Sequence, residues 1–190
     1  LLHGLFSDLR QWYVPIAIGV VLVIAAPSLA ASLRLGHLLA QTDTRTLAAR
    51  WIGENIPAGA KIALDWPFHG PPLASVEHAM PDSTQEYDVT EVGGSGLSSH
   101  PVEYYQTEGY EYLIVSGNVA NLHRTNPVED AERQEFYRSL GERFAVIWEV
   151  SPAAPDTELP FVWDEIYGPF VSIWQRERPG PELKIYQVRP

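Results

Sequence analysis

The longest apolar stretch of the chain lies near its N-terminus. No residue from Gln11 to Leu33 is charged, and the aliphatic side chains leave no polar stripe of the kind that a helix facing water carries. Because a helix rises 1.5 Å per residue, this stretch reaches about 34 Å, which exceeds the roughly 30 Å hydrocarbon core of a bilayer. The pattern predicts one transmembrane helix within residues 1–40, with the lipid bilayer as its partner, and a kink or an early helix end at Pro27.

A secretory signal peptide is a competing interpretation of this stretch, because residues 28–30 (Ser-Leu-Ala) fit a small-x-small cleavage site after an apolar run. A buried helix of a soluble protein is a further alternative. Under the first two interpretations, the chain that follows is exported. The positive-inside rule does not fix the orientation, since Arg10 precedes the stretch and Arg34 and Arg45 follow it.

Beyond residue 40, segments with the helical period alternate with short apolar segments that have the strand period. The spacing predicts helices over 43–56, 99–106 and 127–144, strands over 61–65, 87–92, 110–116, 145–150 and 183–188, and an extended segment around 170–174. The strand 110–116 is apolar almost throughout, which predicts a central position in its sheet. The fold class is therefore α/β: one N-terminal transmembrane helix, then a small mixed-sheet domain over 41–190 with helices packed on the sheet.

Charge and composition exclude several classes of partner and chemistry. All but one of the 24 acidic residues and all but two of the 13 basic residues follow residue 40, so residues 41–190 carry a formal net charge of −12. That charge argues against nucleic acid and anionic lipid surfaces as partners. The chain has no cysteine, which excludes disulfides, a thiol nucleophile and a thiolate-bound metal.

A proline-rich loop after the strand 61–65 carries two candidates for substrate binding. Trp66 and His69 can offer a surface on which a sugar stacks, and a loop folded back over the core is the alternative. A small exported hydrolase that uses Asp65, His69 and Asp88 is a further hypothesis, based on residue type alone.

The glycine-rich segment 93–96 lies between a predicted strand and a predicted helix, where backbone N–H groups can cradle a phosphate, and Ser95 is its candidate side chain. The segment lacks the third glycine of a dinucleotide fingerprint and any Gly-Lys-Ser/Thr, so a flexible connector is the alternative. Leu97 stands where a nucleophile elbow requires glycine.

The sequence predicts no metal site and no cofactor. The six histidines do not fall at the spacings of known metal motifs. A loose acidic group suits calcium in chemistry but not in the spacing of the 12-residue calcium loop, so a solvated acidic edge is the alternative. That group consists of Asp82, Glu86, Asp88 and Glu91.

Four segments, taken in order, resemble one family of membrane enzymes. The first has the pattern Asp-x-Arg-x-x-Ala-x-x-Trp-Ile-x-x-Asn-Ile-Pro-x-Gly-x-x-Ile over residues 43–62, and the others are 109–116, 136–140 and 178–186. They are similar to the C-terminal soluble domain of bacterial GT-C type glycosyltransferases. These polytopic enzymes are related to protein O-mannosyltransferases and lipid A aminoarabinose transferases. The resemblance covers nearly all of residues 43–190.

This resemblance implies transfer of a sugar from a polyprenyl-phosphate donor at the bacterial cell membrane, with the soluble domain outside the cytoplasm. It implies upstream transmembrane helices in the same polypeptide and a catalytic carboxylate in an early extracytoplasmic loop, outside this chain. No catalytic residue is therefore assigned here, and an inactive accessory domain of the glycosyltransferase is expected. A membrane-anchored or secreted carbohydrate-binding module that acts alone is the alternative.

Overall fold

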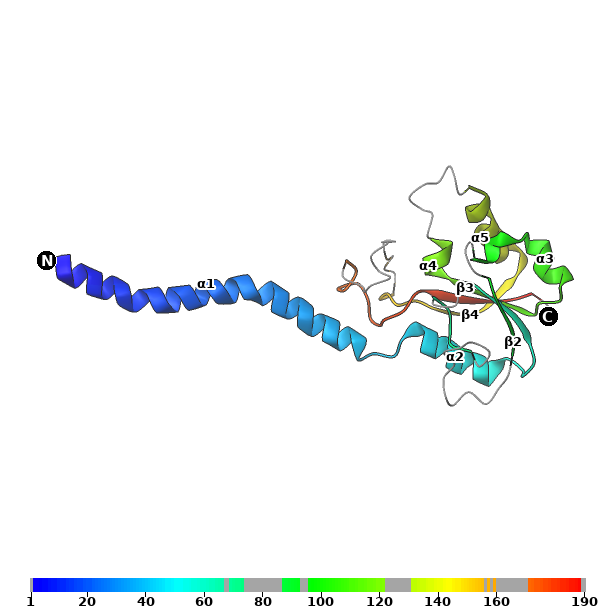
Figure 1. Ribbon diagram of the computed structural model, residues 1–190, viewed down its shortest axis with the longest axis horizontal. Helices are drawn as coiled ribbons and strands as arrows, with labels where there is room; N and C mark the ends of the chain where they lie inside the picture. The colour runs from blue at the N-terminus through cyan, green and yellow to red at the C-terminus, as the bar shows by residue number, and fades with distance from the viewer. Residues whose placement is uncertain are drawn as a thin grey trace. The chain divides into compact units, whose positions relative to one another are not determined.

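The structure is a computed structural model that describes residues 2–66, 69–73, 87–92, 96–121, 131–155, 157, 159 and 171–188, with side chains from Tyr13 onward (Figure 1). The chain forms two compact units, Leu1–Ala40 and Gln41–Pro190. The first is a single helix and the second is an α/β domain.

The first unit consists of helix α1 (Leu2–Leu39). From Tyr13 to Ala30 its apolar side chains are exposed, with Val23 75% and Ile24 71% exposed, whereas Leu38 near its C-terminal end is buried. The helical run that begins at Tyr13 contains an 18-residue window with a mean hydropathy of 2.4, and none of that window is buried, unlike the core helix of a soluble protein. The chain therefore has a helix that is long and apolar enough to cross a membrane.

Helix α1 extends further than its apolar stretch predicts. Pro15 and Pro27 both lie inside the helix, which continues to Leu39, so the prediction of an early end at Pro27 is wrong. A proline removes one N–H group from the hydrogen-bond ladder and leaves the ladder beyond it intact, so one proline does not have to end a long apolar helix.

The second unit is built on a five-stranded sheet in the order β2-β1-β3-β5-β4. The strands are β1 (Lys61–Leu64), β2 (Asp88–Glu91), β3 (Tyr112–Ser116), β4 (Ala145–Val150) and β5 (Leu183–Gln187). Strand β1 is parallel to β2 and β3, whereas β5 is antiparallel to both of its neighbours, β3 and β4. The mixed sheet and the central position of β3 confirm the predictions from the sequence.

Helices cover both faces of the sheet (Figure 1). Helix α2 (Thr44–Asn55) lies on one face, and α3 (Val102–Thr107) and α5 (Ala131–Arg143) lie on the other. The short helices η2 (Gly96–Ser99) and α4 (Gly117–Ala120) follow β2 and β3. The predicted helix 99–106 thus divides into η2 and α3, and the described part of the predicted helix 127–144 is α5.

Strand β3 separates the two hydrophobic cores. Its residue Ile114 packs into the core that includes Ile52 of α2, whereas Leu113 packs into the core that includes Leu140 of α5. Because successive side chains of a strand point to opposite faces, a strand between two helical layers must be apolar on both sides. All five residues of β3 are buried, as that position requires.

The C-terminal segment packs against the start of α2. Asp43 caps that helix by accepting a hydrogen bond from the Arg45 N–H, and the Thr44 N–H donates to the Pro179 carbonyl at 3.0 Å. Gly180 has φ +98°, and a β-carbon there would overlap Thr44 Oγ1. Residues 171–175 form turns, so the prediction of an extended segment around 170–174 is wrong for its described part.

Truncating the central strand should cost far more stability than truncating the edge strand. Leu113 is fully buried in β3, so Leu113→Ala should lower the free energy of unfolding by about 2–5 kcal/mol. The matched control is Val146→Ala in β4, where the valine is 43% exposed and the loss should be below about 1 kcal/mol. Urea denaturation of residues 41–190, followed by circular dichroism, measures both, and equal losses would contradict the assigned sheet order.

Candidate functional site

The three parallel strands end at one edge of the sheet, and polar groups of the side chains and the backbone meet there. Asp65 directly follows β1, Leu97 lies in η2 after β2, and Ser116 is the last residue of β3. The chain places β2 on one side of β1 and β3 on the other, so a topological switch point lies at β1. Open α/β sheets bind ligands outside the carboxyl ends of their strands at such a point, which makes this edge the candidate site.

Asp65 is fully buried at this edge and accepts three hydrogen bonds from its own chain. Its Oδ1 accepts from the Leu97 N–H at 2.8 Å and from the Tyr137 hydroxyl at 2.9 Å. Its Oδ2 accepts from the Ser116 N–H at 3.0 Å. One carboxylate therefore connects the end of β1 with η2, β3 and α5. We call Asp65, Leu97, Ser116 and Tyr137 the Asp65 cluster.

Burial governs the protonation of this cluster. It raises the pKa of Asp65 from 3.8 to about 6, although the three donors and the charge of Arg133 favour the ionised form. Burial, and then the charge of Asp65, raise the pKa of Tyr137 well above its usual value, so its hydroxyl stays protonated and donates. At neutral pH the Asp65 carboxylate is ionised and accepts hydrogen bonds from all three donors. This arrangement suits Asp65 to holding the surrounding elements in place rather than to acting as a nucleophile.

Only glycine fits beside Asp65 at position 96. Gly96 has φ +66°, and a β-carbon there would lie 2.6 Å from Cγ1 of Val119 and 2.7 Å from Oδ1 of Asp65. The next N–H, that of Leu97, is directed at Asp65 rather than at a ligand. Gly96 thus lets η2 approach the carboxylate, and Gly93, Gly94 and Ser95 lie outside the described residues.

The two predicted sugar-contact residues lie together, and a third residue joins them. The ring centroids of Trp66 and His69 are 5.6 Å apart with an edge-to-face angle of 70°. Nδ1 of His69 lies 3.3 Å from Nδ2 of Asn118, in α4. Trp66, His69 and Asn118 are all partly exposed, and we call them the Trp66 group.

The Trp66 group offers a hydrogen-bond donor beside an aromatic ring. Burial, and then the charge of Arg45, lower the pKa of His69, which keeps the ring neutral at pH 7. An amide nitrogen only donates, so in this arrangement Nδ1 accepts from Asn118 and Nε2 carries the proton. A neutral N–H donor next to an indole suits a polar ligand with an apolar face, such as a sugar.

Asp88 does not join Asp65 and His69, so the hydrolase hypothesis is wrong. Asp88 pairs with Lys61 at the amino ends of β2 and β1, whereas Asp65 lies beyond the carboxyl end of β1. The length of a four-residue strand, roughly 13 Å, separates the two carboxylates. Both oxygens of Asp65 are in addition engaged by donors of this chain.

The acidic group proposed for calcium is not assembled by the described residues. Asp88 and Glu91 are the two ends of β2, and residues three apart on a strand point to opposite faces. Asp82 and Glu86 lie outside the described residues. In the parts of the chain that the structure describes, no group of three or more histidine, aspartate or glutamate side chains could hold a metal ion.

Besides Thr44 Oγ1, two side-chain polar atoms are buried without a hydrogen-bond partner among the described residues: Ser116 Oγ and one guanidinium nitrogen of Arg133. Both belong to residues that interact with Asp65, the first through its N–H and the second through its charge. A polar group bound at this edge can satisfy them, because a buried donor is costly when it is left unpaired.

The sequence analysis missed Tyr137, Ser116 and Asn118. Their partners lie 49–72 residues away along the chain, and neither periodicity nor motif spacing reports such pairs. The only local signal was an aspartate directly after an apolar strand. Comparison with protein-family models, with curated proteins and with solved structures finds no match for this chain.

The raised pKa of Asp65 predicts a specific pH dependence. Between about pH 4 and 6 the folded protein holds a proton that the unfolded chain releases, so raising the pH through this window costs about 3 kcal/mol of stability. Asp65→Asn cannot ionise. From about pH 4 to about pH 7, its free energy of unfolding should therefore rise relative to that of the natural protein by about 3 kcal/mol in urea denaturation.

Tyr137→Phe is the control for this measurement, because it removes one donor and leaves the carboxyl group in place. It should lower stability at neutral pH by about 1 kcal/mol and, unlike Asp65→Asn, it should still lose stability as the pH rises, with the loss extending to higher pH because the Tyr137 donor favours the ionised form of Asp65. If Asp65→Asn shows the same pH dependence as the natural protein, Asp65 is not the group that titrates in this window.

Proposed function

We propose that this chain is the C-terminal part of a bacterial membrane glycosyltransferase that takes a sugar from a polyprenyl-phosphate donor. In this proposal α1 spans the cell membrane, and the α/β domain lies outside the cytoplasm. The domain is an accessory domain that contacts the acceptor, and the catalytic residues belong to upstream parts of the same polypeptide. The resemblance of residues 43–62, 109–116, 136–140 and 178–186 to such enzymes supports the assignment of family.

The observation that carries the proposal is the exposed apolar surface of α1 directly before a folded domain. Helix α1 ends at Leu39 and α2 begins at Thr44. Side chains such as Val23 and Ile24 are far more exposed than a helix in water would tolerate, whereas lipid satisfies them without a protein partner. A polyprenyl donor is itself confined to the bilayer, so a domain held by such a helix remains beside it.

The Trp66 group lies at the end of the domain where the chain arrives from α1. Arg45, in the first turn of α2, lies close enough to His69 to lower its pKa. The start of α2 and the carboxyl ends of β1 and β3 are therefore at the same end of the domain. In the proposed enzyme, a sugar acceptor bound by Trp66, His69 and Asn118 would lie at the end of the domain to which α1 connects.

The second candidate function is a membrane-anchored carbohydrate-binding module that acts without upstream helices. The same Trp66 group favours it, since that group offers a ring and a donor whatever precedes α1. The two functions differ in one measurement. A transferase polypeptide makes glycosylated product from a polyprenyl-phosphate sugar, whereas a binding module retains glycan without converting it.

Removing α1 should release the domain from the membrane. Residues 1–190 should stay in the membrane pellet after alkaline carbonate extraction, because α1 is held by its apolar surface, and residues 41–190 should be soluble and folded. Intact mass spectrometry of the membrane-bound chain should show the N-terminal segment uncleaved. Release of the longer chain at alkaline pH, or cleavage after Ala30, would contradict a spanning helix.

Loss of the His69 N–H donor should weaken binding of the sugar acceptor and leave the turnover rate unchanged. In the full-length transferase, His69→Ala should raise the apparent KM for the acceptor about five-fold, the effect of one hydrogen bond, with kcat unchanged. The control is His100→Ala, whose ring stacks on Tyr104 in α3 and should leave KM unchanged. Equal effects of the two variants would contradict the acceptor site, and transferase activity from residues 41–190 alone would contradict an accessory role.

A further inference from the structure

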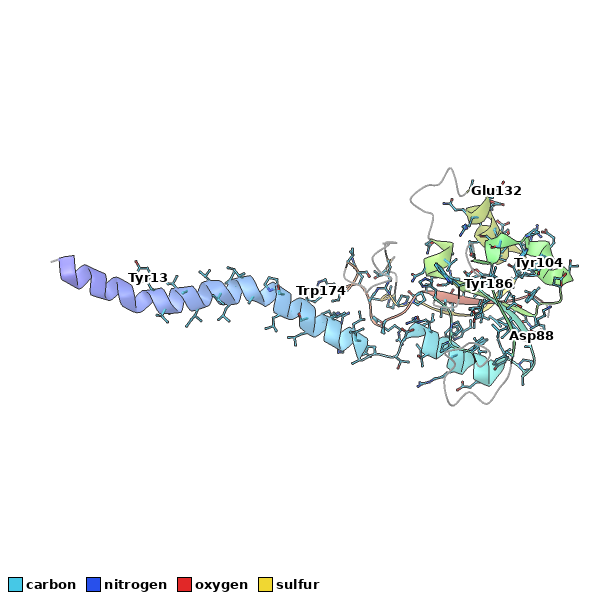
Figure 2. All side chains as sticks on the ribbon, viewed as in Figure 1. Tyr13, Asp88, Tyr104, Glu132, Trp174 and Tyr186 are labelled. Atoms are coloured by element: carbon cyan, nitrogen blue, oxygen red, sulfur yellow. The ribbon has the colours of Figure 1, made fainter. Side chains whose placement is uncertain are left out.

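Two large apolar side chains are displayed on the turn 171–176. Trp174, labelled in Figure 2, is 61% exposed, and Val171 is 57% exposed. Between them, Ser172 and Ile173 are buried. The same short segment therefore contributes to the interior and presents an indole and an isopropyl group outward.

The turn is firmly built, so this exposure is not that of a loose loop. Arg176 is 5% exposed; its Nε donates to Ser172 Oγ at 2.7 Å, and its NH1 donates to the Gly180 carbonyl at 2.8 Å. The Gln175 N–H donates to the Ser172 carbonyl, and the Glu177 N–H donates to the Pro152 carbonyl. A rigid turn that holds an exposed tryptophan is typical of a contact surface, because rigid aromatic side chains lose little entropy on binding.

The turn packs, through the residues that follow it, against the start of α2. The turn leads into Pro179 and Gly180, which pack against Asp43 and Thr44 at the start of α2. Leu39, the last residue of α1, is four residues before Asp43, and four residues span at most about 14 Å. The start of α2, against which this segment packs, is therefore tethered to α1 by a short connection.

The two segments that form the turn and its contact with α2 are less acidic than the rest of the domain. Residues 41–46 and 171–180 together carry three arginines and two acidic residues, a formal net charge of +1. The remainder of residues 41–190 carries −13. These two segments therefore add no net repulsion from headgroup phosphates.

We propose that Val171 and Trp174 form an interfacial anchor that inserts into the headgroup region of the bilayer that α1 crosses. Tryptophan favours this region because its ring is apolar and its indole N–H can still hydrogen-bond to headgroups and water. The anchor rests on the proposed spanning by α1. It would fix the rotation of the domain on the membrane, since α1 alone leaves the domain free to turn about the intervening residues.

The absence of cysteine makes single labelled cysteines a clean test in the complete chain of residues 1–190. Gln175→Cys reports on the anchor without removing Trp174 or Val171. Asp88→Cys is the control, because Asp88 is exposed at the amino end of β2, the opposite end of the sheet (Figure 2). Val23→Cys reports on α1. Each variant carries an environment-sensitive fluorophore in phosphatidylcholine vesicles, with nitroxide quenchers in headgroups, in acyl chains or in water.

The headgroup nitroxide should quench the label at position 175 and leave the label at position 88 unaffected. Adding Trp174→Ala should lower the ratio of inserted to free turn about ten-fold, the effect expected for loss of one partly buried aromatic side chain. If the headgroup nitroxide quenches neither position 175 nor position 88, while acyl-chain nitroxides quench position 23, the proposed anchor is wrong and the proposed spanning helix is supported. Protection of position 175 from all quenchers would mean that protein covers the turn, which also overturns the anchor. Aqueous quenching at position 23 would instead overturn the proposed spanning.

Discussion

The carboxylate of Asp65 is the constraint on which the candidate site depends. Removing a charge from water costs several kcal/mol, and the fold offsets this cost by directing three donors at one side chain. The same hydrogen bonds attach η2 and α5 to the sheet, since helices take no part in the hydrogen bonds between strands. Without the carboxylate, the N–H groups of Leu97 and Ser116 would be buried and unpaired. Gly96 is part of this arrangement, since any side chain there would occupy the space of the carboxylate.

The geometry of the Trp66 group follows from this constraint. Trp66 directly follows Asp65, and Asn118 lies two residues beyond Ser116, so both are positioned by segments that the carboxylate joins. His69 then meets the side chain of Asn118 and the ring of Trp66. A buried interaction thus controls the spacing of the exposed side chains. A rigid support of this kind lets weak single contacts act together on a ligand.

Local pattern predicted most of the fold, because most elements bury an apolar face of fixed period. The alternation in 87–92, the apolar run in 110–116 and the helical spacing in 43–56 each correspond to an element of the structure. Two local inferences were wrong: the early helix end at Pro27, one of two alternatives there, and the extended segment around 170–174. In the second, the alternation of Val171, Ser172 and Ile173 resembles a strand, but the bonds of Arg176 to Ser172 and Gly180 fix a turn. The Asp65 cluster could not be predicted, since its members lie 32, 51 and 72 residues from the aspartate.

Several features that are independent in sequence meet at one end of the domain. Thr44, at the start of α2, contacts Pro179 and Gly180, which follow the turn 171–176. The charge of Arg45 in the same helix lowers the pKa of His69, which lies beyond the carboxyl end of β1. In the proposed enzyme this end faces the bilayer, and the acidic remainder faces water. A lipid-linked donor keeps its reactive phosphate at headgroup depth, so an acceptor site is useful only if the domain presents it there. With a single flexible connection, the domain would rotate freely about the membrane normal, and the acceptor site would face every direction. A second contact with the membrane is the simplest way to hold the domain in the orientation that brings the acceptor to the donor.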